Sequence, residues 1–372
     1  MKKARHVLGI SGGKDSAALA IYLKDKYPQL DIDYYCCDTG KELDETYQLI
    51  DRLEGYLGKK IEKLIAEDAK LNPSDAPFDH FLKIYRDYLP SSAARWCTKK
   101  LKLEPFEKYV GDKATISYVG IRGDENREGY ISKKSNIQSI FPFRKNIWSL
   151  DVVNKVLVGT NNNFFIEIYS QFFKGRKLDK VISLLDEPST TPDKQIQKLD
   201  DLLNVGIVEF NKAVFAFLKT TKYPLAFEND FPLLENDEVL VREDIFKLLR
   251  NSGVGVPGYY EKLEYKVEDK KGEYARSRSG CYFCFFQQKI EWIWLYEQHP
   301  DLYIKAMEYE DPDKGFTWNQ HESLKDLIQP RRIEQIKSDH LKRQNKEKSI
   351  KSPYLIDILD DTESDGCAAC FI

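Results

Sequence analysis

A glycine-rich hexapeptide near the beginning of the chain has the residue types of a phosphate-binding loop. Residues 11–16 read Ser-Gly-Gly-Lys-Asp-Ser and lie between an apolar run at 6–10 and a helix-like run at 17–27. Glycines permit close approach of the backbone, amides at a helix N-terminus hold anionic oxygens, and Lys14 adds a positive charge. The spacing is not that of the Walker loop. We expect a phosphate site here; an ordinary glycine turn is the alternative.

Cysteines are the second group of residues that could take part in chemistry. The chain has seven, an odd number that argues against a disulfide framework and favours metal or sulfur chemistry. They are Cys36, Cys37, Cys97, Cys281, Cys284, Cys367 and Cys370. Cys36 and Cys37 alternate within a strand-like run, so we expect them to be small buried side chains. The last two pairs have Cys-x-x-Cys spacing, which leaves a zinc site and an iron–sulfur cluster both open.

The segments that must position these residues alternate between strand and helix. Strand-like runs at 6–10, 32–37 and 116–121 are separated by helical patterns at 17–27 and 44–56. This order is typical of an α/β fold with a parallel sheet flanked by helices. Ligands of such sheets bind beyond the carboxyl ends of the strands, which is where the hexapeptide falls.

The remaining sequence divides into further regions. Residues 1–149 are the expected nucleotide-binding α/β domain, and 150–230 are a mostly helical insert interrupted by Asn-rich and Pro-rich turns. Residues 231–290 return to the first domain's fold. Residues 291–372 are a helical C-terminal region with a cysteine-containing tail.

Composition excludes some classes of protein. The chain has 372 residues, 42% of them hydrophobic and 31% charged, which fits a folded protein and not a mostly disordered one. No apolar run approaches the ~18–20 residues of a membrane helix, so we expect a cytoplasmic protein with no membrane partner. The net charge of −3 gives no general sign of a nucleic-acid partner.

The hexapeptide is identical to the PP-loop of the adenine-nucleotide alpha hydrolases, whose fold is HUP-like. Further segments resemble the phosphoadenosine-phosphosulfate (PAPS) reductase branch of that superfamily, in the order that this branch uses. They are Asp38-Thr-Gly40, Arg95-Trp-Cys-Thr-Lys-Lys-Leu-Lys102, Gly120-Ile-Arg-Gly-Asp-Glu-Asn-Arg127 and Gly280-Cys-x-x-Cys284. Asn126 departs from the pattern, which has serine there. The resemblance covers about residues 5–130 and 230–290.

The resemblance implies a set of site residues. Lys14, Asp15, Arg122 and Arg127 would be catalytic. The ATP-binding set would be Ser11, Gly12, Gly13, Lys14, Asp15, Ser16, Asp38, Thr39, Gly40, Gly120 and Arg122. Cations that approach phosphate or sulfate would be Arg95, Lys99, Lys100 and Lys102. Cys97, Cys281 and Cys284 would bind a [4Fe-4S] cluster, with zinc as the alternative, and the fourth ligand would be Cys367 or Cys370, or one iron would stay open.

The overall pattern most resembles the ATP-pyrophosphatase subunits of bacterial DNA phosphorothioation systems, of the Dnd and Ssp types. That resemblance implies cleavage of ATP, with Mg²⁺, to AMP and pyrophosphate, adenylation of a DNA backbone phosphate and replacement of AMP by sulfur. Implied partners are a cysteine desulfurase, DNA and other subunits of a modification complex. The alternatives are a PAPS or APS reductase, a tRNA sulfur-inserting enzyme and a non-catalytic nucleotide-sensing subunit of a phage-defence complex.

Overall fold

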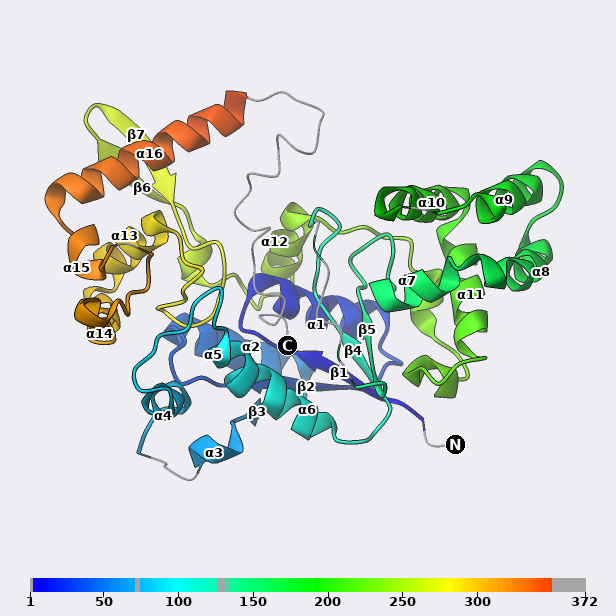
Figure 1. Cartoon of the computed structure of the whole chain (residues 1–372), viewed down its shortest axis with the longest axis horizontal. Coiled ribbons are helices and arrows are strands. Elements are labelled where there is room, and N and C mark those ends of the chain that lie inside the picture. Colours follow the sequence, from blue (N-terminus) through cyan, green and yellow to red (C-terminus); the bar gives the residue numbers. More distant parts are fainter. Residues whose placement is uncertain are drawn as a thin grey trace.

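A computed structural model describes residues 3–70, 74–125, 127, 132, 134–189, 191–320 and 322–349. Its centre is a parallel five-stranded sheet of order β3-β2-β1-β4-β5 (Figure 1). The strands are β1 (Arg5–Gly9), β2 (Ile32–Cys37), β3 (Ile61–Leu64), β4 (Thr115–Tyr118) and β5 (Ile137–Ile140). The expected α/β fold with a parallel sheet flanked by helices is therefore confirmed. The strands β3 and β5 were not expected, because four residues carry too little pattern to identify a strand.

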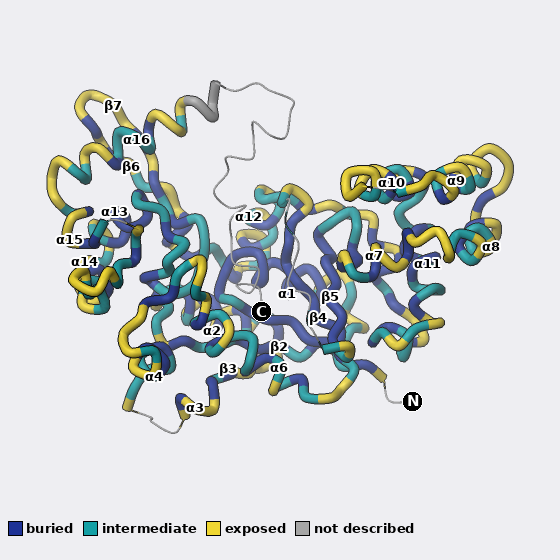
Figure 2. The backbone as a smooth tube through the Cα atoms, in the orientation of Figure 1, coloured by how far each residue is buried: buried dark blue, intermediate teal, exposed yellow. Residues whose placement is uncertain are grey.

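Alternate side chains of the strands pack on opposite faces of the sheet. Leu8 packs in the same buried cluster as α1 (Lys14–Lys26), α2 (Asp44–Leu57) and α12 (Arg242–Asn251). Its neighbour Val7 packs on the opposite face with Tyr35 and with Phe106 of α6 (Glu104–Val110). Because successive side chains of a strand point to opposite faces, this alternation covers both sides of the sheet. Figure 2 shows the sheet as the buried centre of the molecule.

The strand order creates the place where a ligand can bind. β1 is central, with β2 on one side and β4 on the other. The chain winds outward from β1 to β2 and β3, and then returns to the other side of β1 for β4 and β5. At such a reversal, the loops after the two neighbouring strands diverge and leave a crevice. The loops after β1 and β4 contain residues 11–16 and 120–125, so they meet at this crevice.

The basic segment that contains Cys97 is helical. It runs through α5 (Trp96–Thr98) and a π-helical turn (Lys99–Leu103) directly into α6. A π-helical turn widens the helix by one residue and is frequent at functional sites. It also displaces the apolar side chains from regular 3.6-residue spacing, which explains why the sequence pattern does not predict a helix here.

Two helical regions extend from the two sides of the sheet in Figure 1. The first comprises α7 (Leu150–Val156), α8 (Asn162–Phe172), α9 (Arg176–Asp186), α10 (Pro192–Val205) and α11 (Ile207–Leu218). Its buried side chains, such as Val153 and Phe210, belong to the same cluster as Leu8 of β1. This helical segment therefore shares a core with the sheet.

The second region contains the hairpin β6 (Leu263–Val267) and β7 (Lys270–Tyr274), followed by α13 (Lys289–Gln298), α14 (Pro300–Met307), α15 (Leu324–Leu327) and α16 (Pro330–Ser349). It packs against α4 (Pro77–Ile84) and α5 through a buried cluster that includes Phe78, Trp96 and Trp292. The short α3 (Glu67–Lys70) lies before α4. None of the described helices has both the length and the apolar character that crossing a membrane requires.

Candidate functional site

Two glycines allow the loop after β1 to take its path. Gly12 has φ +73°, and a Cβ there would lie 2.2 Å from Cγ2 of Thr46. Gly120, in the loop after β4, would place a Cβ 2.9 Å from the carbonyl oxygen of Asp15. A side chain at the first position would meet both a strained backbone and a clash, and one at the second would push the two loops apart. The glycines therefore bring residues 11–16 and 120–125 into contact.

Hydroxyl groups brace the loop. Ser16 Oγ accepts a hydrogen bond from the Ser11 amide and donates one to the Gly13 carbonyl oxygen, both at 3.2 Å. Tyr259, from a segment far along the chain, donates its hydroxyl to the Gly12 carbonyl oxygen at 2.9 Å. These hydrogen bonds fix the path of the loop at the N-terminus of α1, the end of a helix that favours a bound anion.

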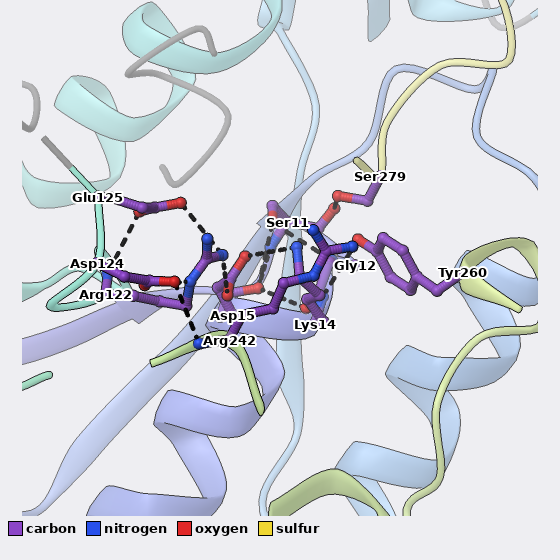
Figure 3. Close-up of polar contacts among 12 residues, drawn as sticks. Ser11, Gly12, Lys14, Asp15, Arg122, Asp124, Glu125, Arg242, Tyr260 and Ser279 are labelled. Carbon is purple, nitrogen blue, oxygen red and sulfur yellow. Dashed lines mark hydrogen bonds and ion pairs between the residues drawn. The ribbon is translucent and has the colours of Figure 1, made fainter. Parts of the chain in front are cut away.

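Lys14, Asp15 and Arg122 form a buried ionic group (Figure 3). Arg122 Nη1 lies 3.0 Å from Asp15 Oδ1, and Lys14 Nζ lies 3.3 Å from Asp15 Oδ2. The side chains of Lys14 and Arg122 are each 3% exposed. The structure thus brings together three of the four residues expected to be catalytic.

Arg122 is held by further carboxylates. Its Nε donates to Asp124 at 2.9 Å and its Nη1 lies 3.2 Å from Glu125. Arg127, the fourth expected catalytic residue, is connected to Arg122 through Glu125, with which it pairs at 2.9 Å. Burial raises the pKa of Glu125, and the two arginines oppose that rise. In this arrangement Arg122 positions Asp15 and the 120–125 loop, and a polyphosphate would have to compete with carboxylates for the guanidinium groups.

Residues of the 242–279 segment contact the loop, although the sequence analysis assigned them no role. The Tyr260 hydroxyl accepts a hydrogen bond from the Lys14 amide at 3.4 Å, and Lys14 Nζ lies 5.1 Å from the centre of the Tyr260 ring. Figure 3 shows Arg242 extending along the same side of the loop. Ser279 Oγ donates to the Ser11 carbonyl oxygen at 3.4 Å. The available signal was the resemblance of residues 230–290 to the PAPS reductase branch.

The Asp38-Thr39-Gly40 segment follows β2 at the same edge of the sheet. Asp38 Oδ1 accepts hydrogen bonds from the Gly40 amide at 2.9 Å and from the Tyr47 hydroxyl at 3.0 Å. Thr39 donates to Glu42 at 2.6 Å, and its Oγ1 lies 3.2 Å from Cys281 Sγ. This segment therefore connects the end of β2 to the cysteine loop.

Cys97, Cys281 and Cys284 line one cavity of about 50 Å³. Its walls are largely aromatic, with Phe283 and Trp318 among them, and Ser279 and Lys102 also line it. Burial raises the pKa of the Cys281 and Cys284 thiols above their usual value. Without a bound metal, both groups are therefore protonated near neutral pH.

Of the described cysteines, Cys36 and Cys37 do not line this cavity. Cys36 and Cys37 lie in β2, where burial raises the pKa of each to about 12. Cys367 and Cys370 lie outside the described residues, as does Asn126.

The thiol donors suit a thiolate-bound metal in their chemistry, as zinc and iron–sulfur clusters both require. Their arrangement does not close around an ion, because the described part of the chain contains no group of three or more His, Cys, Asp or Glu side chains placed to hold one. The cavity therefore supplies the ligand types of a cluster, whereas its described side chains do not form a site for a single ion.

The part of the chain that contains the 11–16 loop matches a known family. Residues 5–147 match the phosphoadenosine phosphosulfate reductase domain. This match supports the PAPS reductase-like family for the nucleotide-binding part of the chain, including residues 11–16 and 120–127. A nucleotide-utilising enzyme is the function class that the family indicates.

One relative matches part of the chain, and no function is assigned to it. An uncharacterized protein of Methanocaldococcus jannaschii is 32% identical over 149 residues, which are 36% of this chain and 28% of the relative. The matched segment thus spans little more than a quarter of that protein. No solved structure matches the chain.

The expected phosphate-binding cations of the PAPS reductase-like part have different surroundings. Lys102 lines the cysteine cavity, whereas Lys100 pairs with Glu104 at 2.9 Å, a contact that raises the pKa of Lys100. Arg95 and Lys99 are exposed. Only Lys102 among them is therefore brought to the thiols directly, and Arg95 lies close by through its contact with Phe286.

Proposed function

We propose that this chain is an ATP pyrophosphatase that activates a nucleic-acid backbone phosphate for sulfur insertion. One observation carries the proposal: the phosphate loop and the cysteine loop touch. Ser279, which comes directly before the Gly280-Cys281 step, lies 3.4 Å from the Ser11 carbonyl oxygen and also lines the cavity. A nucleotide bound at one loop would therefore place its phosphates beside the thiols, as ATP-driven sulfur transfer requires.

The first chemical step uses the loop. Backbone amides of residues 12–16 and Lys14 would hold the ATP phosphates, with Mg²⁺ bound through the nucleotide. An oxygen of the acceptor phosphate attacks the α-phosphorus, and pyrophosphate leaves. Lys14 and Arg122 stabilise the negative charge that grows on the leaving group, because preorganised cations in a buried site are more effective than cations in water.

The second step uses the cavity. A sulfur atom delivered by a cysteine desulfurase would be held as the outer sulfur of a persulfide on one cavity cysteine. That sulfur would attack the activated phosphorus, and AMP would leave. A second cavity thiol would then attack the inner cysteine sulfur, which breaks the S–S bond, releases the phosphorothioate and leaves a cysteine disulfide that an external dithiol must reduce. In the alternative arrangement, Cys97, Cys281 and Cys284 would hold a [4Fe-4S] cluster, which would keep the thiols deprotonated and would carry the sulfur in place of a cysteine persulfide. Zinc would instead need Cys281 and Cys284 together with Cys367 and Cys370. The aromatic walls exclude water, which would otherwise hydrolyse the adenylated phosphate.

DNA is our preferred acceptor, with tRNA as the alternative, and further subunits of a modification complex would present it. A non-catalytic nucleotide sensor would bind ATP through the same loop without releasing pyrophosphate.

A sulfonucleotide reductase is the second candidate, and the family match at residues 5–147 favours it. Its nucleophile would be a cysteine of the tail, Cys367 or Cys370, and both lie outside the described residues. A reductase would also release sulfite from PAPS in the presence of a dithiol.

Pyrophosphate release from ATP tests the proposal. We expect release by the wild-type protein with nucleic acid present, and loss of at least 100-fold in Lys14→Ala. Lys198→Ala is the matched control, because Lys198 is also a buried lysine but donates to the Leu185 and Glu187 carbonyl oxygens in the helical region. Sulfite release from PAPS without pyrophosphate release from ATP would reject the proposal in favour of the reductase.

Metal content tests the cofactor separately. After anaerobic purification we expect iron and acid-labile sulfide, both reduced in Cys97→Ala and unchanged in Cys36→Ala, whose thiol lies in β2 away from the cavity. If the protein contains zinc and no iron, the metal is zinc. If it contains neither metal, the cluster is removed from the proposed mechanism.

A further inference from the structure

The mouth of the cysteine cavity carries two aromatic side chains that the proposed reaction does not use. Phe285 and Phe286 directly follow Cys284, line the cavity and are only partly buried. Their ring centres lie 4.4 Å apart. Each packs at the edge of a different buried cluster, so the pair is held in place by both. Phenylalanine rings that remain partly exposed beside a reactive cavity are available to a flat ligand.

Guanidinium groups from two distant segments lie against Phe286. The Cζ atom of Arg95 is 5.0 Å from the ring centre, and that of Arg278 is 5.7 Å away. Arg95 is exposed. Its Nε donates a hydrogen bond to the Ser92 carbonyl oxygen at 3.1 Å. Lys102 adds a third positive charge to the lining of the cavity. Positive charge is therefore concentrated around an aromatic pair.

Aromatic rings next to arginines are the combination that binds single nucleotides of a polynucleotide. A base stacks on the ring face, and guanidinium groups hold the phosphate with paired hydrogen bonds. The base pairs of a duplex keep their faces covered by stacking, so a recessed ring is accessible only to an unpaired base.

We propose that Phe285, Phe286, Arg95 and Arg278 bind one unpaired nucleotide of a nucleic-acid strand at the mouth of the cavity. Its base stacks on Phe285, and its phosphate lies between the two arginines that Phe286 supports. This inference rests on the proposed function, which it deepens: the acceptor enters as a single-stranded or flipped-out nucleotide, and the arginines deliver its phosphate to the thiols and to the ATP loop beyond Ser279.

The test is binding of a fluorescent single-stranded oligodeoxynucleotide, followed by anisotropy without ATP over a series of salt concentrations. We expect Phe285→Leu to weaken binding at least fivefold, because leucine fills apolar space but has no ring to stack on. Phe172→Leu is the matched control, since Phe172 is a phenylalanine of α8 that is 39% exposed and lies outside the cavity.

The salt dependence of binding tests the contact of the arginines with phosphate separately. Arg95→Gln should reduce the slope of log affinity against log salt by about one, the signature of one lost phosphate contact. Arg176→Gln, an exposed arginine at the start of α9, should leave the slope unchanged. A merely structural role for Arg95 would lower the melting temperature without changing the slope.

Three outcomes would overturn the inference. One is equal affinity for the single strand and its duplex. Another is a parallel loss of ATP affinity in Phe285→Leu, which would assign the ring to the adenine of ATP. The third is unchanged oligonucleotide binding in both variants. Pyrophosphate release is measured independently, so its absence in a protein that still binds the strand rejects the proposed function alone.

Discussion

The phosphate loop at 11–16 and the cavity lined by Cys97, Cys281 and Cys284 adjoin each other at Ser279, yet charge is handled differently in the two places. Around the loop, buried cations are already paired: Asp15 holds both Lys14 and Arg122. Around the cavity, thiols lie among aromatic side chains, and burial raises the pKa of Cys281 and Cys284.

This difference affects what each part of the site can bind. A charge that is already paired can exchange a carboxylate for a phosphate without becoming an isolated buried ion, which would cost several kcal/mol. A thiol in an apolar cavity stays neutral until a metal or a sulfur donor replaces its proton. Under the proposed function, the loop could therefore exchange its carboxylate for a nucleotide phosphate, whereas the thiols would first need a metal or a sulfur donor.

The largest effect should come from the backbone of the loop. Gly12→Ala would place a Cβ 2.2 Å from Thr46 at φ +73°, so we expect at least a 1000-fold loss of pyrophosphate release. Gly58→Ala is the control: its φ is +66°, but nothing lies within 4 Å of the added Cβ. It should cost about 1 kcal/mol of stability and leave activity intact. Similar activity in the two variants would contradict the role given to the loop.

Removal of the central arginine should have the next largest effect. Arg122→Gln leaves Asp15, Asp124 and Glu125 without their shared cation, so we expect a loss of about 3 kcal/mol in the free energy of unfolding. Arg332→Gln, which breaks the more exposed pair with Glu322, should cost at most about 1 kcal/mol. Urea denaturation of both variants measures the difference.

The same variant should acquire a pH dependence. Without Arg122, the pKa of Glu125 rises further above its unfolded value, so the folded chain keeps a proton that the unfolded chain releases. Stability of Arg122→Gln should therefore fall, relative to wild type, as pH rises above about 4.5. Parallel stability curves between pH 5 and 8 would contradict this account of the loop.

Enclosure in the cavity should slow the alkylation of Cys281 and Cys284. In metal-free protein, Cys281 and Cys284 should react with iodoacetamide more slowly at pH 7.5 than the same thiols in urea, because burial raises their pKa values. The rate should increase about tenfold per pH unit up to pH 9, since the thiolate fraction does so below the pKa. Mass spectrometry assigns each site, and a plateau near pH 8.5 would show that the cavity does not shield the thiols.

The smallest effect concerns the contact between the loop and the distant 259–260 segment. Tyr259→Phe removes the hydroxyl that donates to Gly12, so we expect a loss of about 1 kcal/mol in stability and a few-fold loss of activity. Tyr169→Phe should be nearly neutral, because the buried Tyr169 hydroxyl has no hydrogen-bond partner among the described residues. Calorimetry of the pair separates a lost hydrogen bond from a general effect of removing a buried hydroxyl.

Some parts of the site could be predicted because they depend on local sequence. The hexapeptide at 11–16 predicts a loop between a strand and a helix, and α1 begins at Lys14 as such a loop requires. The alternation of strands and helices predicts the parallel sheet, because short connections force each helix back across it. The π-helical turn at Lys99–Leu103 escaped prediction because no repeating pattern marks it.

The sequence by itself determined the phosphate loop, the type of sheet and the Cys-x-x-Cys pair, since each is a matter of neighbouring residues and backbone freedom. Only the tertiary structure decided which of them meet. Tyr259 reaches Gly12 across 247 residues, and Ser279 reaches Ser11 across 268. Contacts over such separations depend on how whole elements pack, and no local pattern encodes them. For that reason the paired state of Arg122 and the aromatic enclosure of the thiols became visible only in the folded chain.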